Sequence, residues 1–547
     1  MHNYPDMTDW NLADLWDTVT DAQPDAPAIA WGDGTTSWGE FRRRAEAIGA
    51  HLRSVTSGPG ARVALYLRNR PEYLETLYAC LGSRLVPVNT NFRYTGEELA
   101  HVWTDADAEA VVLEPDFVPV ADAVRPGLRT SVRWLCTGDA DAVPDWCTPY
   151  ATLVAAPPVV APLSVGDRSG DDLLFLYTGG TTGLPKGVMW RQDDLFGLGN
   201  EATLTPYPTD GGLAGIGRFR ADRGRGMVNV IACPLMHGTG TMTALATLTN
   251  GGCVVLLRDR GFDPTELFDT VEARHAAGIV FVGDTFARPM AIALEGAPTR
   301  WDLGSLRILY SSGTMWSEPV KAILRAHLPN AMLIDSLGSS EAIGMGASVS
   351  GGGTGSATAQ FSLGANAVVI DNDGQPIAAG SSSIGRLAVR GRSPIGYHKD
   401  PERTVATFPV IDGVRHSVPG DLATIGADGT IHLLGRGSSV INTGGEKVFA
   451  EEVEEVLKTF GGVIDAGVVG IDDDRFGSIV TAVVVPVAGA DLDIDALRQH
   501  TRSHLAGFKV PKHIMVATTL GRAANAKLDP RALRALVTAA LADGVVH

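Results

Sequence analysis

Cysteine is scarce in this 547-residue chain, and the five cysteines follow no pattern. They are Cys80, Cys136, Cys147, Cys233 and Cys253, and they include no C-x-x-C pair and no regular spacing. A disulfide framework or a structural zinc site needs paired cysteines, so we expect neither. This usage fits a reducing compartment.

Long apolar runs and an excess of positive charge are also missing. No run reaches the length of about 20 apolar residues that spans a bilayer. The first residues, MHNYPDMTDW, have neither the basic nor the apolar part of a signal peptide. The net charge of −17 argues against nucleic acid as the main partner, because phosphate-backbone binding needs a basic surface. We therefore expect a cytoplasmic protein without integral membrane association.

Lysine is rare too, with eight residues among the 45 lysines and arginines. The chain uses arginine wherever a general positive charge suffices, whereas lysine is a compact point charge that arginine replaces poorly. Three lysines stand in unusual contexts: Lys186 in a loop rich in glycine and threonine, Lys447 after a Gly-Gly pair, and Lys527 near the end of the sequence. These contexts make the three lysines candidate functional residues.

The length exceeds what one hydrophobic core usually supports, so we expect at least two domains. Apolar runs alternate with amphipathic stretches, as in GGCVVLLRD at 251–259, FDPTELFDTVEARHAAG at 262–278 and GIVFVGD at 278–284. This alternation predicts strand, helix and strand, and hence an α/β domain of helix-covered, mostly parallel sheets. Ligands in such domains bind at the carboxyl ends of strands.

The pattern changes after about residue 435, where a helix-like stretch, AEEVEEVLKTF, precedes two β-rich runs, AGVVGI and SIVTAVVVPV. We predict residues 1–435 as a large N-terminal domain and residues 436–440 as a hinge that contains Ser439. Residues 441–547 are then a small α+β domain that contains Lys527. Stretches rich in glycine, proline or serine are predicted to be loops; they lie at 155–170, 205–226 and 350–359.

A strand, LLFLY, runs directly into TGGTTGLPKGVMW at 178–190. Glycines allow backbone N–H groups to approach a phosphate, threonines add hydroxyl donors, and Lys186 adds charge. The loop is not a Walker A motif, because Pro185 precedes the lysine and Gly187 follows it. The predicted phosphate-binding residues are Thr178, Gly179, Gly180, Thr181, Thr182, Gly183 and Lys186.

TGGTTGLPKG resembles the signature loop of the adenylate-forming superfamily, which contains acyl-CoA synthetases, peptide-synthetase adenylation domains and firefly-type luciferases. Further blocks resemble the family in the same order: DSLGSSEA, GRLAVRG with GY, PGDLATIGADGTIHLLGR, INTGGEKVFAEEVE and GRAANAKLDP. Within the family, GGTTGLPKGVMWR, DSLGSSE and GRGSSVINTGGEKV are similar to actinobacterial acyl-CoA synthetases that act on fatty acids or steroid side-chain carboxylates.

The resemblance implies that residues 1–435 are an ATP- and acyl-binding domain and that residues 441–547 are a mobile lid domain carrying Lys527. It also implies a role for each matching residue. Lys527 would be the catalytic lysine, Thr182 a catalytic threonine, and Glu341 a catalytic residue and the ligand of Mg²⁺. The remaining implied nucleotide contacts are Ser312, Gly313, Asp335, Ser336, Ser340, Asp421 and Arg436. The implied acyl-pocket residues are His237, Gly283, Asp284 and Gly338, although a lone histidine such as His237 is as readily structural. The implied CoA-channel residues are Gly444, Gly445 and Lys447.

Three positions depart from the family pattern. Ala526 stands where glycine is usual, Leu337 where many relatives have an aromatic residue against adenine, and Pro419 where threonine is common. Proline removes a hydroxyl and a backbone donor near the nucleotide. None of the three removes a charged group that the chemistry needs.

We therefore expect an ATP-dependent acid–thiol ligase that uses ATP, Mg²⁺ and coenzyme A. It would convert a carboxylic acid to its acyl-AMP and then to an acyl-CoA. A fatty acid or a steroid side-chain carboxylate is expected, and an aryl acid stays open. Transfer of the acyl group to a separate carrier protein and a non-catalytic nucleotide-binding protein are the alternatives. A serine hydrolase is disfavoured, because no G-x-S-x-G elbow occurs. A homodimer is the default expectation.

Overall fold

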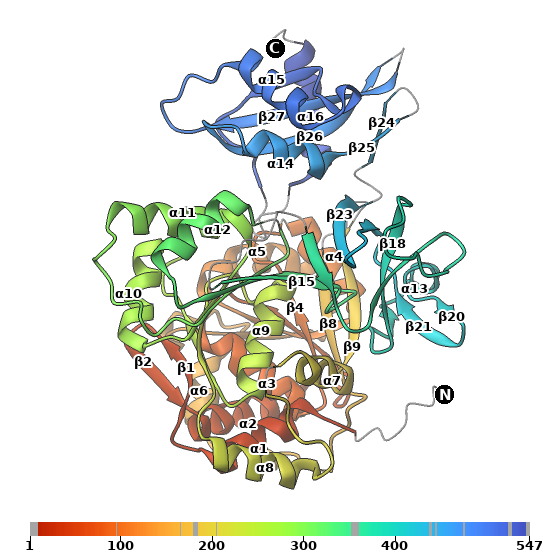
Figure 1. The fold of residues 1–547 in the computed structure, drawn as a ribbon. Helices are drawn as coiled ribbons and strands as arrows, with labels where there is room; N and C mark the ends of the chain where they lie inside the picture. The colour runs from red at the N-terminus through yellow and green to blue at the C-terminus, as the bar shows by residue number, and fades with distance from the viewer. Residues whose placement is uncertain are drawn as a thin grey trace.

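A computed structural model describes residues 9–94, 96–164, 166–178, 184–203, 205–314, 316–351, 360–436, 440–443, 446–473, 476–522 and 528–542. A large N-terminal part contains two sheets with helices around them, and a smaller C-terminal part lies beside it (Figure 1). The predicted α/β class, with a large domain of sheets and a small α+β domain, is confirmed.

Within the described part of the chain, the larger sheet has 15 strands, which form two different halves. One half is parallel except at its edge; in spatial order it contains β2 (Gly34–Ser37), β1 (Pro27–Trp31), β11 (Cys253–Leu256), β10 (Val228–Ile231), β12 (Gly278–Phe281), β13 (Ile308–Ser312) and β14 (Met332–Leu337). The other half is antiparallel; it contains β15 (Gly346–Ser350), β16 (Gln360–Leu363), β23 (Thr430–Arg436), β22 (Asp421–Ile425), β18 (Gly385–Arg390), β21 (Val414–Ser417) and β20 (Val410–Ile411), with β17 (Ala367–Ile370) beside β18.

The second sheet has eight strands. Its order is β19 (Gly396–Tyr397), β9 (Lys186–Arg191), β8 (Leu173–Thr178), β4 (Val86–Asn89), β3 (Arg62–Tyr66), β5 (Ala108–Leu113), β6 (Arg133–Cys136) and β7 (Thr148–Pro149). Strands β8 and β9 form an antiparallel hairpin, and β19 adds antiparallel to β9. The remaining pairs are parallel, as predicted for most of this domain.

Helices of the large part cover these sheets (Figure 1). They are α1 (Leu12–Ala22), α2 (Trp38–Val55), α3 (Pro71–Gly82), α4 (Gly96–Asp105), α5 (Val118–Val124), α6 (Tyr150–Ala155), α7 (Gln192–Ala202), α8 (Gly212–Arg223), α9 (Gly238–Thr249), α10 (Pro264–Arg274), α11 (Gly283–Gly296), α12 (Glu318–His327) and α13 (Pro401–Thr407). Short 3₁₀ turns occur at η1 (Pro115–Phe117), η2 (Arg125–Gly127) and η3 (Ala140–Ala142).

The strand–helix–strand reading of 251–284 is confirmed by β11, α10 and β12. Helix α10 begins where the sequence provides a capping residue: the Asp263 side chain accepts a hydrogen bond from the Thr265 N–H, and Pro264 fills the first helical position. It ends at Arg274, because His275 adopts a left-handed conformation with φ of 47°.

Residues 205–226, where the sequence predicts a loop, contain helix α8 instead. The prediction was wrong because burial outweighs the low helix propensity of glycine. Ile216 and Arg220 of α8 are buried, and the helix packs on α1. Gly217 assists this packing, since a β-carbon there would lie 3.4 Å from the Thr18 methyl group.

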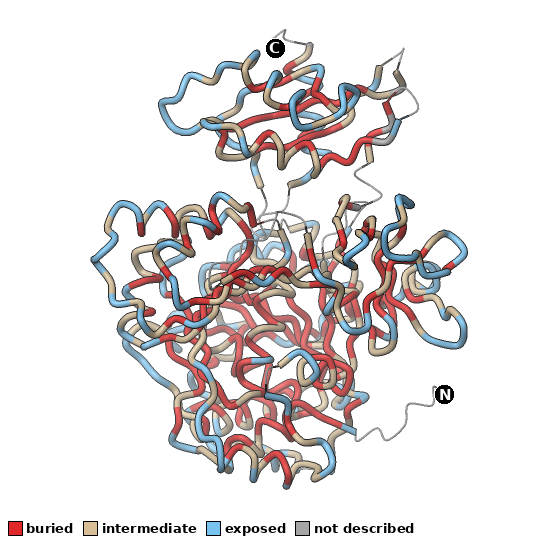
Figure 2. Tube along the Cα trace, in the orientation of Figure 1, coloured by how far each residue is buried: buried red, intermediate tan, exposed pale blue. Residues whose placement is uncertain are grey.

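The main core of the large part joins residues of both sheets with residues of α1, α2, α3 and α9. Trp16 of α1 is completely buried and packs its ring 5.0 Å from that of Tyr78 and 6.1 Å from that of Phe41. Burial of each such ring contributes roughly 2 to 3 kcal/mol relative to exposure. Figure 2 shows this buried centre beneath a more exposed outer layer.

The small part is built on one three-stranded sheet and one hairpin. The hairpin pairs β24 (Val440–Thr443) with β25 (Glu446–Phe449); the sheet contains β26 (Val463–Asp473), β27 (Gly477–Pro486) and β28 (His513–Val516). Its helices are α14 (Ala450–Lys458), α15 (Ile494–His504) and α16 (Pro530–Ala542), with the turn η5 at Gly507–Lys509. α14 and α15 share one core cluster with the sheet and α16 shares another, so helices pack against both faces.

No helix among the described residues is both long enough and apolar enough to cross a membrane.

Candidate active site

The predicted phosphate loop joins the two strands of the β8–β9 hairpin. Thr178 ends β8 and pairs with Lys186, which begins β9. Residues 179–183, which include the predicted Thr182, lie outside the described residues. The described end of the connection is anchored by His101, whose Nε2 lies 3.0 Å from the Pro185 carbonyl oxygen. Thr178 and Lys186 therefore lie side by side at the base of the predicted loop.

The base of this hairpin is tied to the loop before α9 by Asn89. The Asn89 amide donates to the carbonyl oxygens of Tyr177 (3.0 Å) and Met236 (2.6 Å), and its oxygen accepts from the Tyr177 N–H (2.6 Å). Asn89 is buried at the end of β4. A buried amide that joins three backbone groups fixes the distance between the predicted phosphate loop and His237, which follows Met236.

Glu341 lies in the connection between β14 and β15. No helix begins in this described connection, so Glu341 is not a helix-capping residue. The connection is fixed by two side chains: the Trp190 Nε1–H donates to the Ser340 carbonyl (2.8 Å), and the Ser417 hydroxyl donates to the Glu341 carbonyl (2.6 Å). The Tyr397 hydroxyl donates to Glu341 Oε1 at 2.9 Å. Glu341 thus has a fixed backbone and one oriented carboxylate oxygen.

The donor set at Glu341 fits a magnesium ion that also binds ATP. The described residues contain no group of three or more carboxylate, histidine or cysteine side chains that would form a complete protein-made metal site. Mg²⁺ in nucleotide sites usually takes only one or two carboxylates and fills its other positions with phosphate oxygens and water. Among the described residues, no hydrogen-bond donor binds Oε2 of Glu341. This carboxylate oxygen is therefore a suitable ligand for Mg²⁺.

Strands β12, β13 and β14 bring the predicted nucleotide residues together at their carboxyl ends, which form one edge of the sheet along the strand direction. Their parallel register aligns Phe281 with Ser311, Ser311 with Asp335, and Ser312 with Ser336. The edge is closed by α9, whose Thr239 hydroxyl donates to the Ser312 carbonyl at 3.4 Å. The carboxyl ends of parallel strands are where open α/β sheets bind ligands.

Gly313 and Gly338 mark close approaches at this edge. A β-carbon on Gly313 would lie 3.3 Å from the Thr239 hydroxyl, and one on Gly338 would lie 3.2 Å from the Ala342 carbonyl. His237 immediately precedes α9, and a β-carbon on the next residue, Gly238, would lie 3.5 Å from the Ser340 hydroxyl. The predicted acyl and nucleotide residues are therefore neighbours around the end of α9.

Asp335 does not present a free carboxylate to this edge. It forms a buried ion pair with Lys321 of α12, with Nζ and Oδ2 2.8 Å apart. Burial raises the pKa of the Asp335 carboxyl to about 6, with the Asp284 and Glu455 carboxylates adding to the rise, while Lys321 opposes it. Lys321 carries the partner charge that the sequence motif alone did not reveal.

Asp284 holds the loop that follows β13. Its carboxylate accepts hydrogen bonds from the Ser317 N–H (2.9 Å) and the Ser317 hydroxyl (2.6 Å), and Arg288 lies 3.2 Å away. The neighbouring Gly283 N–H donates to the buried Ser311 hydroxyl at 2.9 Å. These contacts show how Gly283 and Asp284 shape the edge; direct contact with an acyl group stays a prediction.

Asp421 and Arg436 lie opposite each other on paired strands, at the start of β22 and the end of β23. The Asp421 side chain is 8% exposed. Only the backbone of Arg436 is described. Asp421 and Arg436, which are 15 positions apart in the sequence, are thus neighbours. This proximity is required if both residues contact the same nucleotide.

Helix α14 of the small part packs against β23, on the side of the large part that faces the small part (Figure 1). Burial alone would lower the pKa of Lys458, but the carboxylates of Glu455, Glu454 and Asp284 raise it above its usual value. Gly435 of β23 lies against the Glu451 carboxylate of α14; it has φ of 95°, and a β-carbon there would collide with Glu451. The two parts therefore meet through charged groups of α14.

Besides residues 179–183 with Thr182, the predicted residues Ser439, Gly444, Gly445 and Lys527 lie outside the described residues. Of Lys447 only the backbone is described. Arg522, five positions before Lys527, is described: its guanidinium binds both carboxylate oxygens of Asp465 at 2.7 Å, and it also feels the charges of Glu454 and Glu455 of α14.

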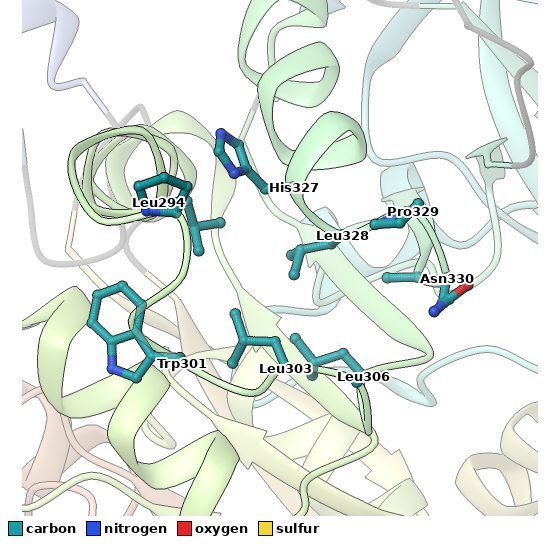
Figure 3. A pocket seen from close by; sticks show the side chains of 11 residues that line it. Leu294, Trp301, Leu303, Leu306, His327, Leu328, Pro329 and Asn330 are labelled. Atoms are coloured by element: carbon teal, nitrogen blue, oxygen red, sulfur yellow. The ribbon is translucent and has the colours of Figure 1, made fainter.

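One cavity of about 140 Å³ opens at the opposite end of the sheet. It lies beside the residues that precede β13 and β14 (Figure 3). Its lining residues are Leu294, Pro298, Trp301, Leu303, Gly304, Leu306, His327, Leu328, Pro329, Asn330 and Ala331. Because Ser312 and Asp335 occupy the other ends of those strands, this cavity is separate from the predicted site.

These features define a two-part α/β protein whose candidate site lies at the strand ends beneath a small domain, and the chain belongs to the AMP-binding enzyme family. The family model matches residues 16–396, and a model of the AMP-binding enzyme C-terminal domain matches residues 452–527. The resemblance predicted from the motifs is confirmed.

Named relatives align along almost the whole chain. A medium/long-chain-fatty-acid–CoA/3-oxocholest-4-en-26-oate–CoA ligase of Mycolicibacterium smegmatis is 35% identical over 534 residues, covering 95% of each chain. A 3-oxocholest-4-en-26-oate–CoA ligase of Rhodococcus rhodochrous is 35% identical over 541 residues, again covering 95% of each chain. The crystal structure of ATP-bound MatB from Rhodopseudomonas palustris is similar with a TM-score of 0.77 and 26% identity, covering 96% of this chain and 98% of that one.

Sequence reasoning did not assign a role to Tyr397, Asp400, Lys321 or Asn89. In the structure, the Asp400 carboxylate forms an ion pair with the Lys186 ammonium group. Tyr397 stands in the GY block that resembled the family, and Asp400 in an Asp-Pro pair of the kind that begins helices. The signals for Tyr397 and Asp400 were therefore visible. Their partners were not, because the contacts join distant parts of the sequence.

Proposed function

We propose that the chain is an ATP-dependent, AMP-forming acyl-CoA ligase. The observation that carries the proposal is the position of Glu341. Tyr397 orients the Glu341 carboxylate, and Asp400, three residues after Tyr397, contacts the predicted phosphate-binding lysine, Lys186. The near-full-length similarity to named CoA ligases supports the same reaction. Joining a carboxylate to the α-phosphate of ATP requires neutralisation of two anions, and this site offers the groups for it.

In the first half-reaction, a carboxylate oxygen of the acid attacks the α-phosphorus and pyrophosphate leaves. Lys186 would bind phosphate oxygens, and Glu341 would hold the Mg²⁺ that neutralises them when it is bound. Asp421 and Arg436 would hold the ribose side of the nucleotide. Lys527 would stabilise the developing charge on the acyl-phosphate oxygens. Preorganised charges of this kind usually dominate such reactions.

In the second half-reaction, the CoA thiol attacks the carbonyl carbon of the acyl-AMP, and AMP leaves with the bridging oxygen. We propose that residues 441–547 move about the hinge at residues 436–440, which contains Ser439, to open a path for the thiol. Gly444, Gly445 and Lys447 would line that path, because small residues leave room for the narrow arm of CoA. Residues 1–435 would hold the adenylate meanwhile.

We propose a fatty acid or a steroid side-chain carboxylate as the acid. This proposal rests on the two actinobacterial relatives, whose names specify such acids. His237, at the start of α9 beside Ser340, would contact the acid close to its carboxyl end.

A cytoplasmic location and a homodimer complete the proposal. The five cysteines are all free and buried, as suits a reducing compartment. The homodimer would be tested by light scattering of the purified protein.

The test measures acid-dependent release of pyrophosphate with ATP and Mg²⁺. Medium- and long-chain fatty acids, a steroid side-chain acid and an aryl acid are each supplied with and without CoA, and products are identified by mass spectrometry. Pyrophosphate with an acyl-CoA product supports the proposal and names the acid. Pyrophosphate with acyl-AMP that never reacts with CoA would instead identify a carrier protein as acceptor. No acid-dependent release across the panel contradicts the proposed activity.

A further inference from the structure

One short segment contacts both candidate phosphate-site groups. Residues 396–404, GYHKDPERT, begin with strand β19 and continue into helix α13. Tyr397 reaches Glu341, and Asp400 reaches Lys186. Lys186 begins β9 of the eight-stranded sheet, whereas Glu341 lies in the connection that follows β14 of the larger sheet. The segment therefore joins residues that are positioned by different sheets.

The segment is held firmly before it makes these contacts. Its β19 pairs with β9, and the His398 N–H donates to the Gly187 carbonyl at 2.8 Å, next to Lys186. The Thr404 hydroxyl donates to the Asp400 carbonyl (2.7 Å) and accepts from the Tyr397 N–H (2.9 Å). Gly396 is needed for this turn, because a β-carbon there would lie 2.6 Å from the Thr404 methyl group.

Tyr397 can orient Glu341 without blocking it. The tyrosine is 7% exposed, and its ring packs 5.7 Å from that of Phe408, so its hydroxyl has little freedom. The hydroxyl occupies Oε1 of Glu341 at 2.9 Å, which leaves Oε2 for a cation. A carboxylate held by one hydrogen bond loses less conformational entropy when it binds the ion.

Asp400 can orient Lys186 in the same way. One oxygen, Oδ1, accepts from the Arg403 N–H at 3.0 Å and caps α13, and the other, Oδ2, forms the ion pair with Lys186. A lysine ammonium has three donors, so it can keep Asp400 and still bind a phosphate oxygen. A flexible four-carbon side chain is thereby held close to where β8 and β9 meet.

We propose that residues 396–404 form a positioning element, in which Tyr397 aligns Glu341 for Mg²⁺ and Asp400 aligns Lys186 for the nucleotide phosphates. Neither residue contacts the reacting atoms; each acts through its partner. The inference rests on the proposed ATP-dependent function, and it adds the residues that set the geometry of the phosphate site.

The first test is calorimetric binding of a non-hydrolysable ATP analogue at several Mg²⁺ concentrations. Tyr397→Phe removes only the hydroxyl, and we expect half-saturation by Mg²⁺ to rise on the order of tenfold, the usual effect of losing a hydrogen bond to a charged group. Binding without Mg²⁺ stays unchanged. The matched control is Tyr78→Phe, which removes the hydroxyl of a buried tyrosine of α3 that donates to Asp17 of α1 at 2.6 Å. Helices α1 and α3 lie at the end of the large part that is remote from the small part (Figure 1). An unchanged Mg²⁺ requirement in Tyr397→Phe overturns this half of the inference.

The second test is a double-mutant cycle on nucleotide binding. Asp400→Asn keeps the helix cap but removes the charge, and we expect weaker binding on the order of tenfold. In a Lys186→Met background the same substitution should have no effect, because Asp400 acts through Lys186. Asp263→Asn is the matched control, since Asp263 also caps a helix that begins with proline. Additive effects of Asp400→Asn and Lys186→Met overturn the inference.

A substitute variant and a separate readout distinguish failure of this inference from failure of the proposed function. If Asp400→Asn does not fold, Asp400→Ser, which also caps helices well, replaces it in the cycle. Because the readout is nucleotide binding, the inference can fail or succeed independently of acyl-CoA formation. A wild-type chain that binds the Mg²⁺–nucleotide complex but makes no thioester contradicts the proposed activity alone.

Discussion

At the scale of single residues, the site depends on charged groups that are paired before any substrate binds. Lys186 is paired with Asp400, Asp335 with Lys321, and Arg522 with Asp465. Of these three pairs, only Asp335–Lys321 is buried. Removing one member of a buried pair leaves an uncompensated charge and typically costs about 3 to 5 kcal/mol. The environment of each residue therefore matters as much as its identity.

Asp335 should make the protein less stable as the pH rises from about 4 to about 6. Burial raises the pKa of this carboxyl from 3.8 to about 6, so in this window the folded state keeps a proton that the unfolded chain releases. The stability of the folded state then falls by up to about 3 kcal/mol across the window. Asp335→Asn should remove this component, as measured by urea unfolding at a series of pH values.

The slope of the free energy of unfolding against pH tests this prediction. Asp335→Asn also leaves Lys321 without its carboxylate partner, which shifts the stability at every pH and so changes the offset between the two curves. Asp263→Asn, at a partly buried helix cap, serves as the control and should keep the wild-type slope. Identical slopes for the wild type and Asp335→Asn would show that Asp335 does not carry this proton.

Lys527→Ala should abolish acyl-AMP formation while the reaction of preformed acyl-AMP with CoA continues. Loss of one preorganised donor to the developing charge typically costs roughly 100- to 1,000-fold in rate. The two half-reactions are measured separately, by pyrophosphate release and by thioester formation from synthetic acyl-AMP. Lys512→Ala is the control, since Lys512 lies over the Phe476 ring elsewhere in the small domain. Full ATP-dependent activity of Lys527→Ala would refute the assigned role.

At the scale of elements, the alternation of strands and helices was readable from the sequence, and so was the change of pattern near residue 435. β11, α10 and β12 follow the predicted order because their apolar periodicity and the Asp263-Pro264 cap are local signals. Helix α8 was missed, since its glycines pointed to a loop and its stability comes from packing on α1.

The sequence predicted the residues of the candidate site that belong to motifs, but not their partners. The motifs named Lys186, Glu341 and Asp335, and the structure brings Glu341 and Lys186 to one segment and Asp335 to the adjoining strand edge. The partners could not be predicted, because they lie 214, 56 and 14 positions away, respectively. Such pairings are set by tertiary folding, which one sequence does not display.

Helix α14 yields a prediction at this scale. In the described orientation, α14 packs against β23, and its Lys458 lies within the electrostatic reach of Asp284. We therefore expect this orientation to serve the first half-reaction. Lys458→Glu replaces attraction to Glu455, Glu454 and Asp284 by repulsion, and acyl-AMP formation should slow on the order of tenfold or more. Thioester formation from preformed acyl-AMP should change little. Lys512→Glu is the charge-matched control, and equal slowing of both half-reactions in Lys458→Glu would refute the orientation.

At the scale of the whole molecule, two parts of unequal size must cooperate in two reactions. The large part carries Lys186, Glu341 and the strand edge, while the small part carries α14 and the segment after Arg522. The chain passes from β23, which ends at Arg436, to β24, which begins at Val440. A change of backbone angles in this short connection would rotate the small part as a body.

Ser439→Pro should therefore impair the second half-reaction more than the first. Proline fixes φ near −65° and so restricts rotation at the proposed hinge. The ratio of thioester formation to acyl-AMP formation is the measured quantity, and Ser439→Ala, which leaves rotation free, is the control. If Ser439→Pro slowed both half-reactions equally, the hinge would have to lie elsewhere.

The central claim is that the acid is activated as an acyl-adenylate, and isotope transfer tests it most directly. The purified chain is supplied with ATP, Mg²⁺, CoA and a fatty or steroid side-chain acid whose carboxylate carries ¹⁸O, and the products are weighed by mass spectrometry. Attack of that carboxylate on the α-phosphorus, followed by thiol attack on carbon, leaves one ¹⁸O atom in AMP for each thioester formed. AMP without ¹⁸O, or ¹⁸O appearing in inorganic phosphate, would contradict the account.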